Sequence, residues 1–97
     1  MKKASNKQTV SYEPVEVSEE TQVTFTKTVN ADGITVSGII SKKTEEATVN
    51  VGSISYDNHK DTLAVYISKK SALTKEELDK TLAETPAWIG EIVAEEE

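Results

Sequence analysis

The stretch from Gln22 to Ile67 constrains the fold more than any other part of this chain. Apolar and polar residues alternate there with a period of two, in runs separated by short polar segments: 22–30, 34–41, 47–56 and 63–67. Successive side chains of a β-strand point to opposite faces, so this period predicts strands with one buried face. Four such strands in succession predict an antiparallel meander.

The dipeptide Asp32-Gly33 between the first two runs predicts a tight hairpin, because both residues tolerate the positive φ of a type I′ turn. A two-residue turn there sets three cross-strand pairs: Val29 with Val36, Lys27 with Gly38, and Phe25 with Ile40. A four-residue loop over 30–33 keeps the apolar residues on one face but places Phe25 opposite Gly38. A three-residue loop would turn one apolar set away from the other, so we expect an even-numbered loop.

The third run changes phase at Gly52. Val49 and Val51 share one face, but the next apolar residues are Ile54 and Tyr56, which breaks the period of two. A β-bulge at Gly52 would re-aim the rest of the strand, and this is the interpretation we favour. The alternative is that the last two apolar residues lie on the opposite face, under the helix or at a partner surface.

Segment 9–17 also alternates, but Pro14 interrupts it. Proline cannot donate a ladder hydrogen bond, so the segment is predicted to be an edge strand or two short pieces bent at Pro14. Acidic residues gather in and after it, at Glu13, Glu16, Glu19 and Glu20. We interpret them as charges that discourage sheet-to-sheet association at an edge. The alternative is a docking or cation-binding patch.

A capping box predicts the start of a helix at Thr74. Thr74 and Glu77 are three residues apart, so each side chain can accept a hydrogen bond from the other residue's backbone N–H. Leu73 and Leu78 flank the box as a hydrophobic staple. We expect the helix to cover residues 74–84, with a stripe of apolar residues on the sheet: Leu78, Leu82 and Ala83.

Pro86 should end this helix, since the residue before a proline disfavours helical geometry. Segment 86–93 fits two structures. As a helix it would place four apolar residues on one face: Trp88, Ile89, Ile92 and Val93. Because β-branched residues dominate its end, we expect a short C-terminal strand added to the sheet.

Together these patterns predict an α+β fold, with an antiparallel sheet or small open barrel of about five strands and one helix packed on it. We expect one domain over residues 9–93, a disordered polar tail over 1–8 and an acidic tail over 94–97. There are no cysteines, and neither a secretory signal nor a membrane span is evident. A cytoplasmic protein is therefore the default, and an exported one is the alternative.

The composition and motifs exclude much chemistry. The net charge is −6 and all basic residues are lysine, so the forked guanidinium that reads DNA bases and holds phosphates is absent. The only histidine, His59, lies in a polar turn with Asp57 and Asp61, and this spacing matches no defined metal motif. Carboxylate pairs fall in turns or at the helix start. We therefore predict no enzymatic activity, no cofactor and no metal.

We expect a non-catalytic protein-binding or assembly module that acts through a sheet edge or the C-terminal apolar segment. The candidate contact residues are Trp88, Ile89, Ile92, Val93 and Tyr66. The partner is expected to be another protein, and neither a membrane nor a nucleic acid is favoured. One alternative is an acidic nucleic-acid mimic that inhibits a nucleic-acid-binding enzyme. A further alternative is a small β-barrel that binds single-stranded nucleic acid.

Overall fold

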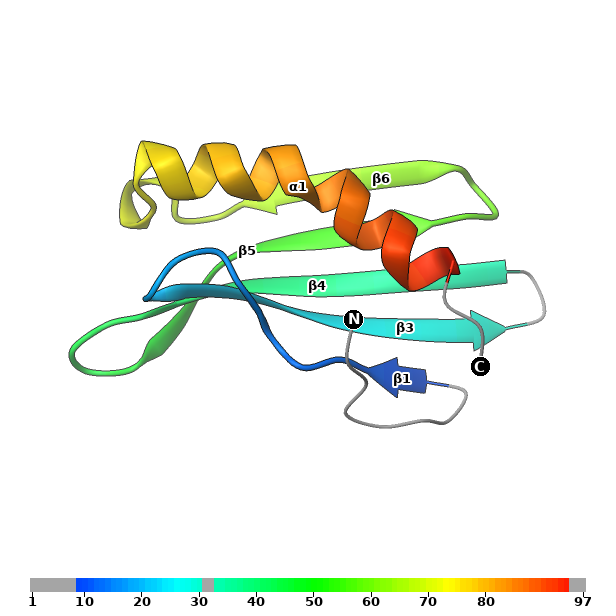
Figure 1. The fold of residues 1–97 in the computed structure, drawn as a ribbon, viewed down its shortest axis with the longest axis horizontal. Helices are drawn as coiled ribbons and strands as arrows, with labels where there is room; N and C mark the ends of the chain where they lie inside the picture. Colours follow the sequence, from blue (N-terminus) through cyan, green and yellow to red (C-terminus); the bar gives the residue numbers. More distant parts are fainter. Residues whose placement is uncertain (1–8, 31–32, 95–97) are drawn as a thin grey trace.

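The computed structural model describes residues 9–30 and 33–94 and has the α+β architecture that the sequence predicts. One antiparallel sheet is followed by a short 3-10 turn, η1 (Lys70–Ala72), and a long helix, α1 (Lys75–Ala94) (Figure 1). The strands are β1 (Thr9–Ser11), β2 (Val15–Glu16), β3 (Thr21–Asn30), β4 (Gly33–Lys43), β5 (Thr48–Asp57) and β6 (Thr62–Ile67). The expected tails at 1–8 and 95–97 lie outside the described residues, and Ala94 belongs to α1.

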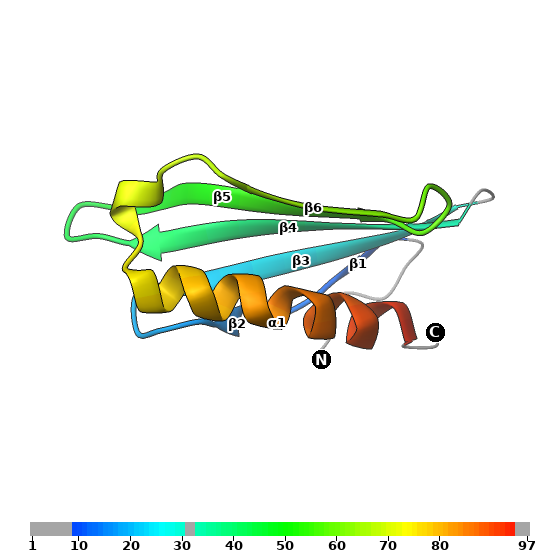
Figure 2. The ribbon, with the colours of Figure 1, turned by 90° about the horizontal axis from the view of Figure 1, so that it is seen from above.

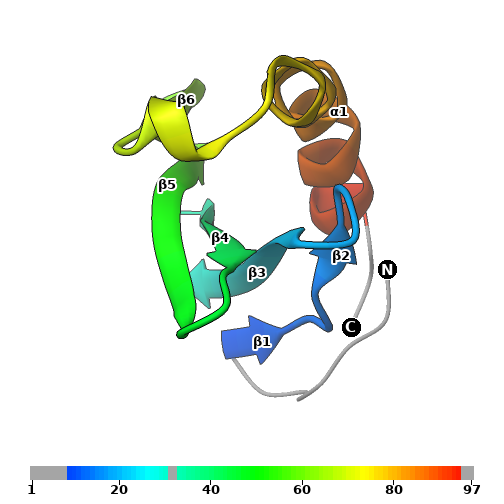
Figure 3. The ribbon, with the colours of Figure 1, turned by 90° about the vertical axis from the view of Figure 1, so that its left-hand side faces the viewer.

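The sheet is a meander with the order β1-β3-β4-β5-β6, and β2 pairs with β3 on the same side as β1. The chain bends between β1 and β2, where Pro14 lies, as predicted. α1 runs along the strands on one face of the sheet (Figure 2). Seen end-on, the sheet curves around the helix, with β1 and β2 at one edge and β6 at the other (Figure 3).

The hairpin between β3 and β4 pairs Phe25 with Gly38 and Asn30 with Gly33. This is the register of the four-residue loop over 30–33, so the even-numbered loop is confirmed. The pairs expected from a two-residue turn at Asp32-Gly33 are wrong: Lys27 faces Val36, Val29 faces Ile34, and Ile40 faces Val23. Residues 31–32 themselves lie outside the described part of the chain.

Gly38 gives the physical reason for this register. A Cβ atom at Gly38 would lie 2.8 Å from Cε1 of Phe25 and 3.2 Å from Cβ of Ile54. The missing side chain leaves room for the Phe25 ring, which is fully buried and meets Trp88 of α1 edge-on, with ring centroids 6.0 Å apart. The alternative register would have placed Lys27 rather than the ring opposite this space.

The bulge in β5 is confirmed. Ile40 pairs with Gly52 and Ser41 pairs with Asn50, so Val51 is the extra residue. Val51 and Ile54 are both buried in the core, so the strand keeps its apolar side chains on the concave face across the irregularity. The alternative, in which Ile54 lies on the opposite face, is wrong.

The C-terminal strand predicted over 86–93 is wrong, because α1 continues through Pro86 to Ala94. The predicted end of the helix at residue 84 is wrong for the same reason. A proline inside a helix costs about 3 kcal/mol. The helical spacing brings Trp88, Ile89 and Ile92 together into the core, and each such burial contributes about 1.5–3 kcal/mol. A strand would have sent Ile89 to the face opposite the other two, so core burial outweighs the local cost.

The predicted apolar stripe of α1 is also corrected. Leu82 is 47% exposed and Ala83 faces solvent, whereas Glu77, Thr81 and Thr85 are buried. The Thr81 and Thr85 hydroxyls donate to the backbone carbonyls one turn earlier, at 2.8 and 2.6 Å. Their polar groups are thus satisfied within the helix, which lets the first half of α1 turn a polar face to the sheet.

Gly38 and Gly90 provide a matched test of this packing, because one is tightly surrounded and the other is open. We predict that Gly38→Ala lowers the free energy of unfolding by roughly 1–3 kcal/mol, because the new methyl group overpacks the Phe25 site. Gly90→Ala should raise it by about 1 kcal/mol, because alanine favours the helix and a Cβ there meets no atom within 4 Å. Urea unfolding followed by Trp88 fluorescence measures both. Equal stability of the two variants would contradict the register described here.

Candidate functional site

Glu77 is a candidate catalytic group, because its carboxylate is buried at the start of α1. Oε2 accepts hydrogen bonds from the hydroxyls of Ser18 and Thr21, both at 2.6 Å. Oε1 accepts from Nζ of Lys42 at 3.0 Å and from the backbone N–H of Thr74 at 2.9 Å. Glu77 N–H donates to Oγ1 of Thr74 at 3.1 Å, so the predicted capping box is confirmed. We call these five residues the Glu77 clasp.

The clasp holds its carboxylate ionised. Burial raises the pKa of Glu77. The hydrogen bonds from Ser18, Thr21, Thr74 and Lys42 lower the pKa by more than burial raises it, and the result is a pKa of about 2. A general acid at neutral pH needs a raised pKa instead. The geometry therefore suits a structural role: the clasp ties α1 to the turn before β3 and to the end of β4.

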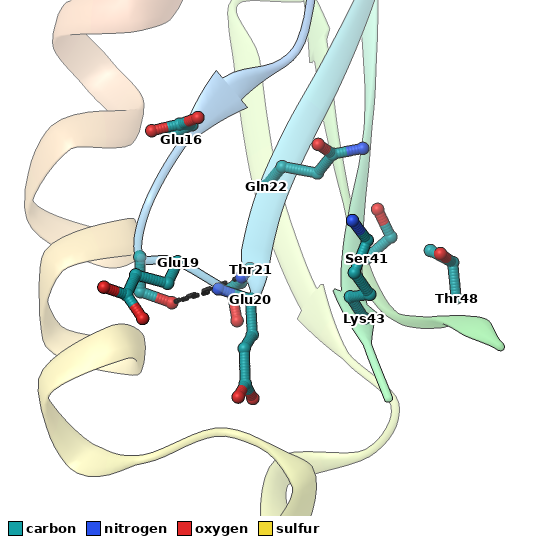
Figure 4. A pocket seen from close by; sticks show the side chains of 9 residues that line it. Glu16, Glu19, Glu20, Thr21, Gln22, Ser41, Lys43 and Thr48 are labelled. Carbon is teal, nitrogen blue, oxygen red and sulfur yellow. Dashed lines mark hydrogen bonds between the residues drawn. The ribbon is translucent and has the colours of Figure 1, made fainter. Parts of the chain in front are cut away.

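Next to the clasp, the turn before β3 borders a shallow polar hollow of about 140 Å³ (Figure 4). Three of the predicted acidic residues line it, but the carboxylates of Glu16, Glu19 and Glu20 point in different directions, and Lys43 lies apart from them, beside Ser41. Within residues 9–30 and 33–94, no group of three or more His, Cys, Asp or Glu side chains has the geometry of a metal site. The hollow offers no convergent set of ligands.

The turn that contains His59 is stabilised by hydrogen bonds between a side chain and the backbone of the same turn. Oδ1 of Asp57 accepts hydrogen bonds from the backbone N–H groups of His59 and Lys60, at 2.9 and 3.3 Å. Asp61 adopts a positive φ of 52°. These are features of a side-chain-stabilised turn between two strands, and His59 itself is exposed.

The predicted contact residues separate into two groups. Trp88, Ile89 and Ile92 are 9%, 4% and 0% exposed and form part of the core, and Val93 is half-buried. The C-terminal apolar segment is therefore packed on the sheet and does not form a free surface. Tyr66 of β6 is 66% exposed.

The two edges of the sheet differ in how well they are protected against pairing with another strand, and β6 is the less protected edge. The edge formed by β1 and β2 consists of two very short strands, is broken at Pro14 and carries Glu13 and Glu16. These are common devices against edge-to-edge pairing. The sequence of β6, TLAVYI, has neither a charge nor a proline, and Leu63 on one face is 43% exposed and Tyr66 on the other is 66% exposed.

Part of the β6 backbone faces the open edge. Ser68 N–H donates to the carbonyl of Val51 at 2.9 Å, which continues the ladder with β5 beyond Ile67. Hydrogen-bonded and non-hydrogen-bonded pairs alternate in an antiparallel ladder. The N–H and C=O groups of Leu63, Val65 and Ile67 therefore point away from β5. Among the described residues, no strand pairs with β6 on that side.

An apolar flank of α1, in which Leu82 is 47% exposed and Leu78 is half-buried against the core, lies on the same side of the molecule as β6. Glu76 and Lys80 line a hollow together with Val17, so that side of the helix faces β2. By the helical spacing, Leu78 and Leu82 are on the other side of the buried face from Glu76 and Lys80, and therefore on the side away from β2. β6 lies on that side of the helix (Figure 3). We call Leu78 and Leu82 the Leu82 flank. The sequence predicted that these two leucines would be buried, and the exposure of Leu82 is what marks this surface.

We predict that Glu77→Gln lowers the free energy of unfolding at pH 7 by about 2 kcal/mol, because a neutral amide cannot replace an ionised acceptor. The folded-state pKa of about 2 lies below the ordinary 4.5. The stabilisation is therefore fully present above pH 4.5 and is lost as the pH falls from 4.5 toward 2. Urea unfolding of both proteins between pH 7 and pH 2 should show their stabilities converging.

Glu76→Gln is the matched control, since it removes the same charge from an exposed neighbour. Its stability should stay close to that of the wild-type protein across the whole pH range. If Glu77→Gln behaved like this control, the clasp would not be the source of stability that we describe.

No helix within the described residues is long and apolar enough to cross a membrane. Comparison of the chain with protein-family models, with curated proteins and with solved structures finds no match.

Proposed function

We propose that this protein is a non-catalytic binding or assembly module that accepts a strand of another chain at the β6 edge. The observation that carries the proposal is the contrast between the two edges of one sheet. The β1 and β2 edge is short, bent and acidic, whereas β6 is uncharged over Thr62–Ile67 and exposes Leu63 and Tyr66. An unprotected apolar edge strand is a liability in a monomer, and binding a strand removes that liability.

Strand addition uses both the backbone and the side chains of such an edge. The outward N–H and C=O groups of Leu63, Val65 and Ile67 would supply the main-chain hydrogen bonds that give affinity. Alternate side chains of the added strand would lie on the concave face near the Leu82 flank. The others would lie on the convex face beside Tyr66. A bound strand with apolar residues at alternate positions therefore fits this surface.

Neither nucleic-acid alternative gains support from the arrangement of the described residues. Stacking of successive bases needs several exposed rings, but Tyr12, Phe25 and Trp88 are buried. Among the described residues, Tyr66 is the one Phe, Tyr or Trp side chain that is mainly exposed. A mimic of a phosphate backbone needs a continuous acidic surface, but Lys42 and Lys43 lie beside Glu20 and Glu45 around one hollow.

The proposal predicts that Val65→Pro abolishes binding while leaving the fold intact. Proline removes the outward N–H at the centre of the edge and is tolerated where that group faces solvent. The control is Val65→Thr, which keeps the N–H and the β-branched shape. Tagged wild-type and variant proteins are exposed to an extract of the native host that also contains the untagged protein.

Wild-type and Val65→Thr proteins should retain a bound chain, and Val65→Pro should lose it. Circular dichroism and thermal unfolding verify that both variants fold. Equal retention by a folded Val65→Pro protein would rule out strand addition at β6.

A further inference from the structure

We infer that the chain added at β6 is a second copy of this protein, paired antiparallel about a two-fold axis at Val65. This inference rests on the proposed function, because it names the partner of the same edge. Two copies related by a two-fold axis present the same surface to each other, so the edge must be complementary to itself. The sequence of β6 and its flanks meets that requirement.

The backbone favours one symmetric register. The outward-facing residues of β6 are Leu63, Val65 and Ile67, and they are evenly spaced about Val65. Centring the axis on Val65 pairs Leu63 with Ile67 of the second copy and Val65 with its own counterpart. All three positions then exchange both backbone bonds, which gives about six inter-chain hydrogen bonds. Shifting the axis by one residue in either direction leaves one of the three without a partner inside the strand.

The side chains agree with the same register. On the concave face it aligns Leu63, which is 43% exposed, with Ile67, and it aligns the two Val65 residues. On the convex face it sets the exposed ring of Tyr66 beside the small Ala64 of the other copy. Cross-strand contacts between apolar side chains on one face are the unit of sheet stabilisation.

Charged residues flank β6 just outside the strand. Asp61 precedes it in the turn, with a positive φ of 52°. Lys69 follows it, where the N–H groups of Ser68 and Lys69 both donate to the carbonyl of Val51 and the regular ladder ends. The two-fold axis brings the start of one β6 near the end of the other, so the end of the strand with Asp61 meets the end with Lys69 of the second copy. Opposite charges attract, and this arrangement is equivalent at both ends of the strand pair.

The size of this contact predicts a reversible dimer. A stable protein interface buries about 800 Å² on each partner, and a single edge strand with the Leu82 flank offers a smaller surface. Sedimentation equilibrium of the wild-type protein should therefore show a concentration-dependent exchange between monomer and dimer. Val65→Pro should shift it to the monomer.

Introduced cysteines test the register, because the chain has no cysteine of its own. Across a hydrogen-bonded pair the Cα atoms are about 5.5 Å apart, which a disulfide can span. Val65→Cys should therefore form a covalent dimer in a redox buffer in which oxidised glutathione accepts the two electrons and is reduced. Leu63→Cys is the matched control, because four residues along the strands separate the two copies of position 63 by about 13 Å. The Leu63→Cys, Ile67→Cys double variant should cross-link like Val65→Cys.

Covalent dimer from Val65→Cys should exceed that from Leu63→Cys by at least about tenfold on a non-reducing gel. Equal or greater cross-linking of Leu63→Cys would overturn the register. A wild-type protein that stays monomeric, with neither Val65→Cys nor the double variant cross-linking, would overturn self-pairing. If the same protein still retained a different host protein, and Val65→Pro did not, the proposed function would stand alone. If the wild-type protein retained no host protein, both the self-pairing and the proposed function would be contradicted.

Discussion

The attachment of α1 to β3 is the constraint on which the rest of the structure depends. The carboxylate of Glu77 accepts a hydrogen bond from Thr21, the ring of Trp88 packs on Phe25, and Lys27 donates to the carbonyl of Ile92 at 3.3 Å. The three β3 residues point to the same face of the sheet and hold the helix along its whole length. β6 is three strands from β3 in the order of the sheet, and none of these three contacts involves it.

The Lys27 contact shows how this attachment tolerates a charge in the core. Lys27 is only 1% exposed, yet its ammonium group lies at the C-terminal end of α1, where the backbone carbonyls concentrate negative partial charge. Glu77 occupies the opposite end, where the N-terminal N–H groups favour a carboxylate. The helix dipole thus matches a buried anion at one end and a buried cation at the other. Both groups make directional hydrogen bonds between α1 and β3, next to a core made mainly of aliphatic side chains.

Local rules predicted the elements, and long-range contacts decided their details. The period-two runs, the bulge at Gly52 and the capping box at Thr74 depend on neighbouring residues, so the sequence was enough to find them. The length of α1 depended on Phe25, far away in the chain, which makes burial of Trp88 outweigh the cost of Pro86. The burial of Glu77 depended equally on distant hydroxyls. The sequence alone shows that β6 is uncharged, but only the topology shows that β6 is an edge strand.

The unequal edges also limit the size of any assembly. If both edges were apolar and unbroken, each added copy would expose a new edge, and the sheets could grow into a fibre. Pairing about Val65 uses the unprotected edge of both copies at once. The edges left at the two ends are then β1 and β2, where Pro14 removes a donor and Glu13 and Glu16 repel a further strand. Because Pro14, Glu13 and Glu16 protect the edge formed by β1 and β2, pairing at the exposed β6 edge gives a closed dimer and not a growing fibre.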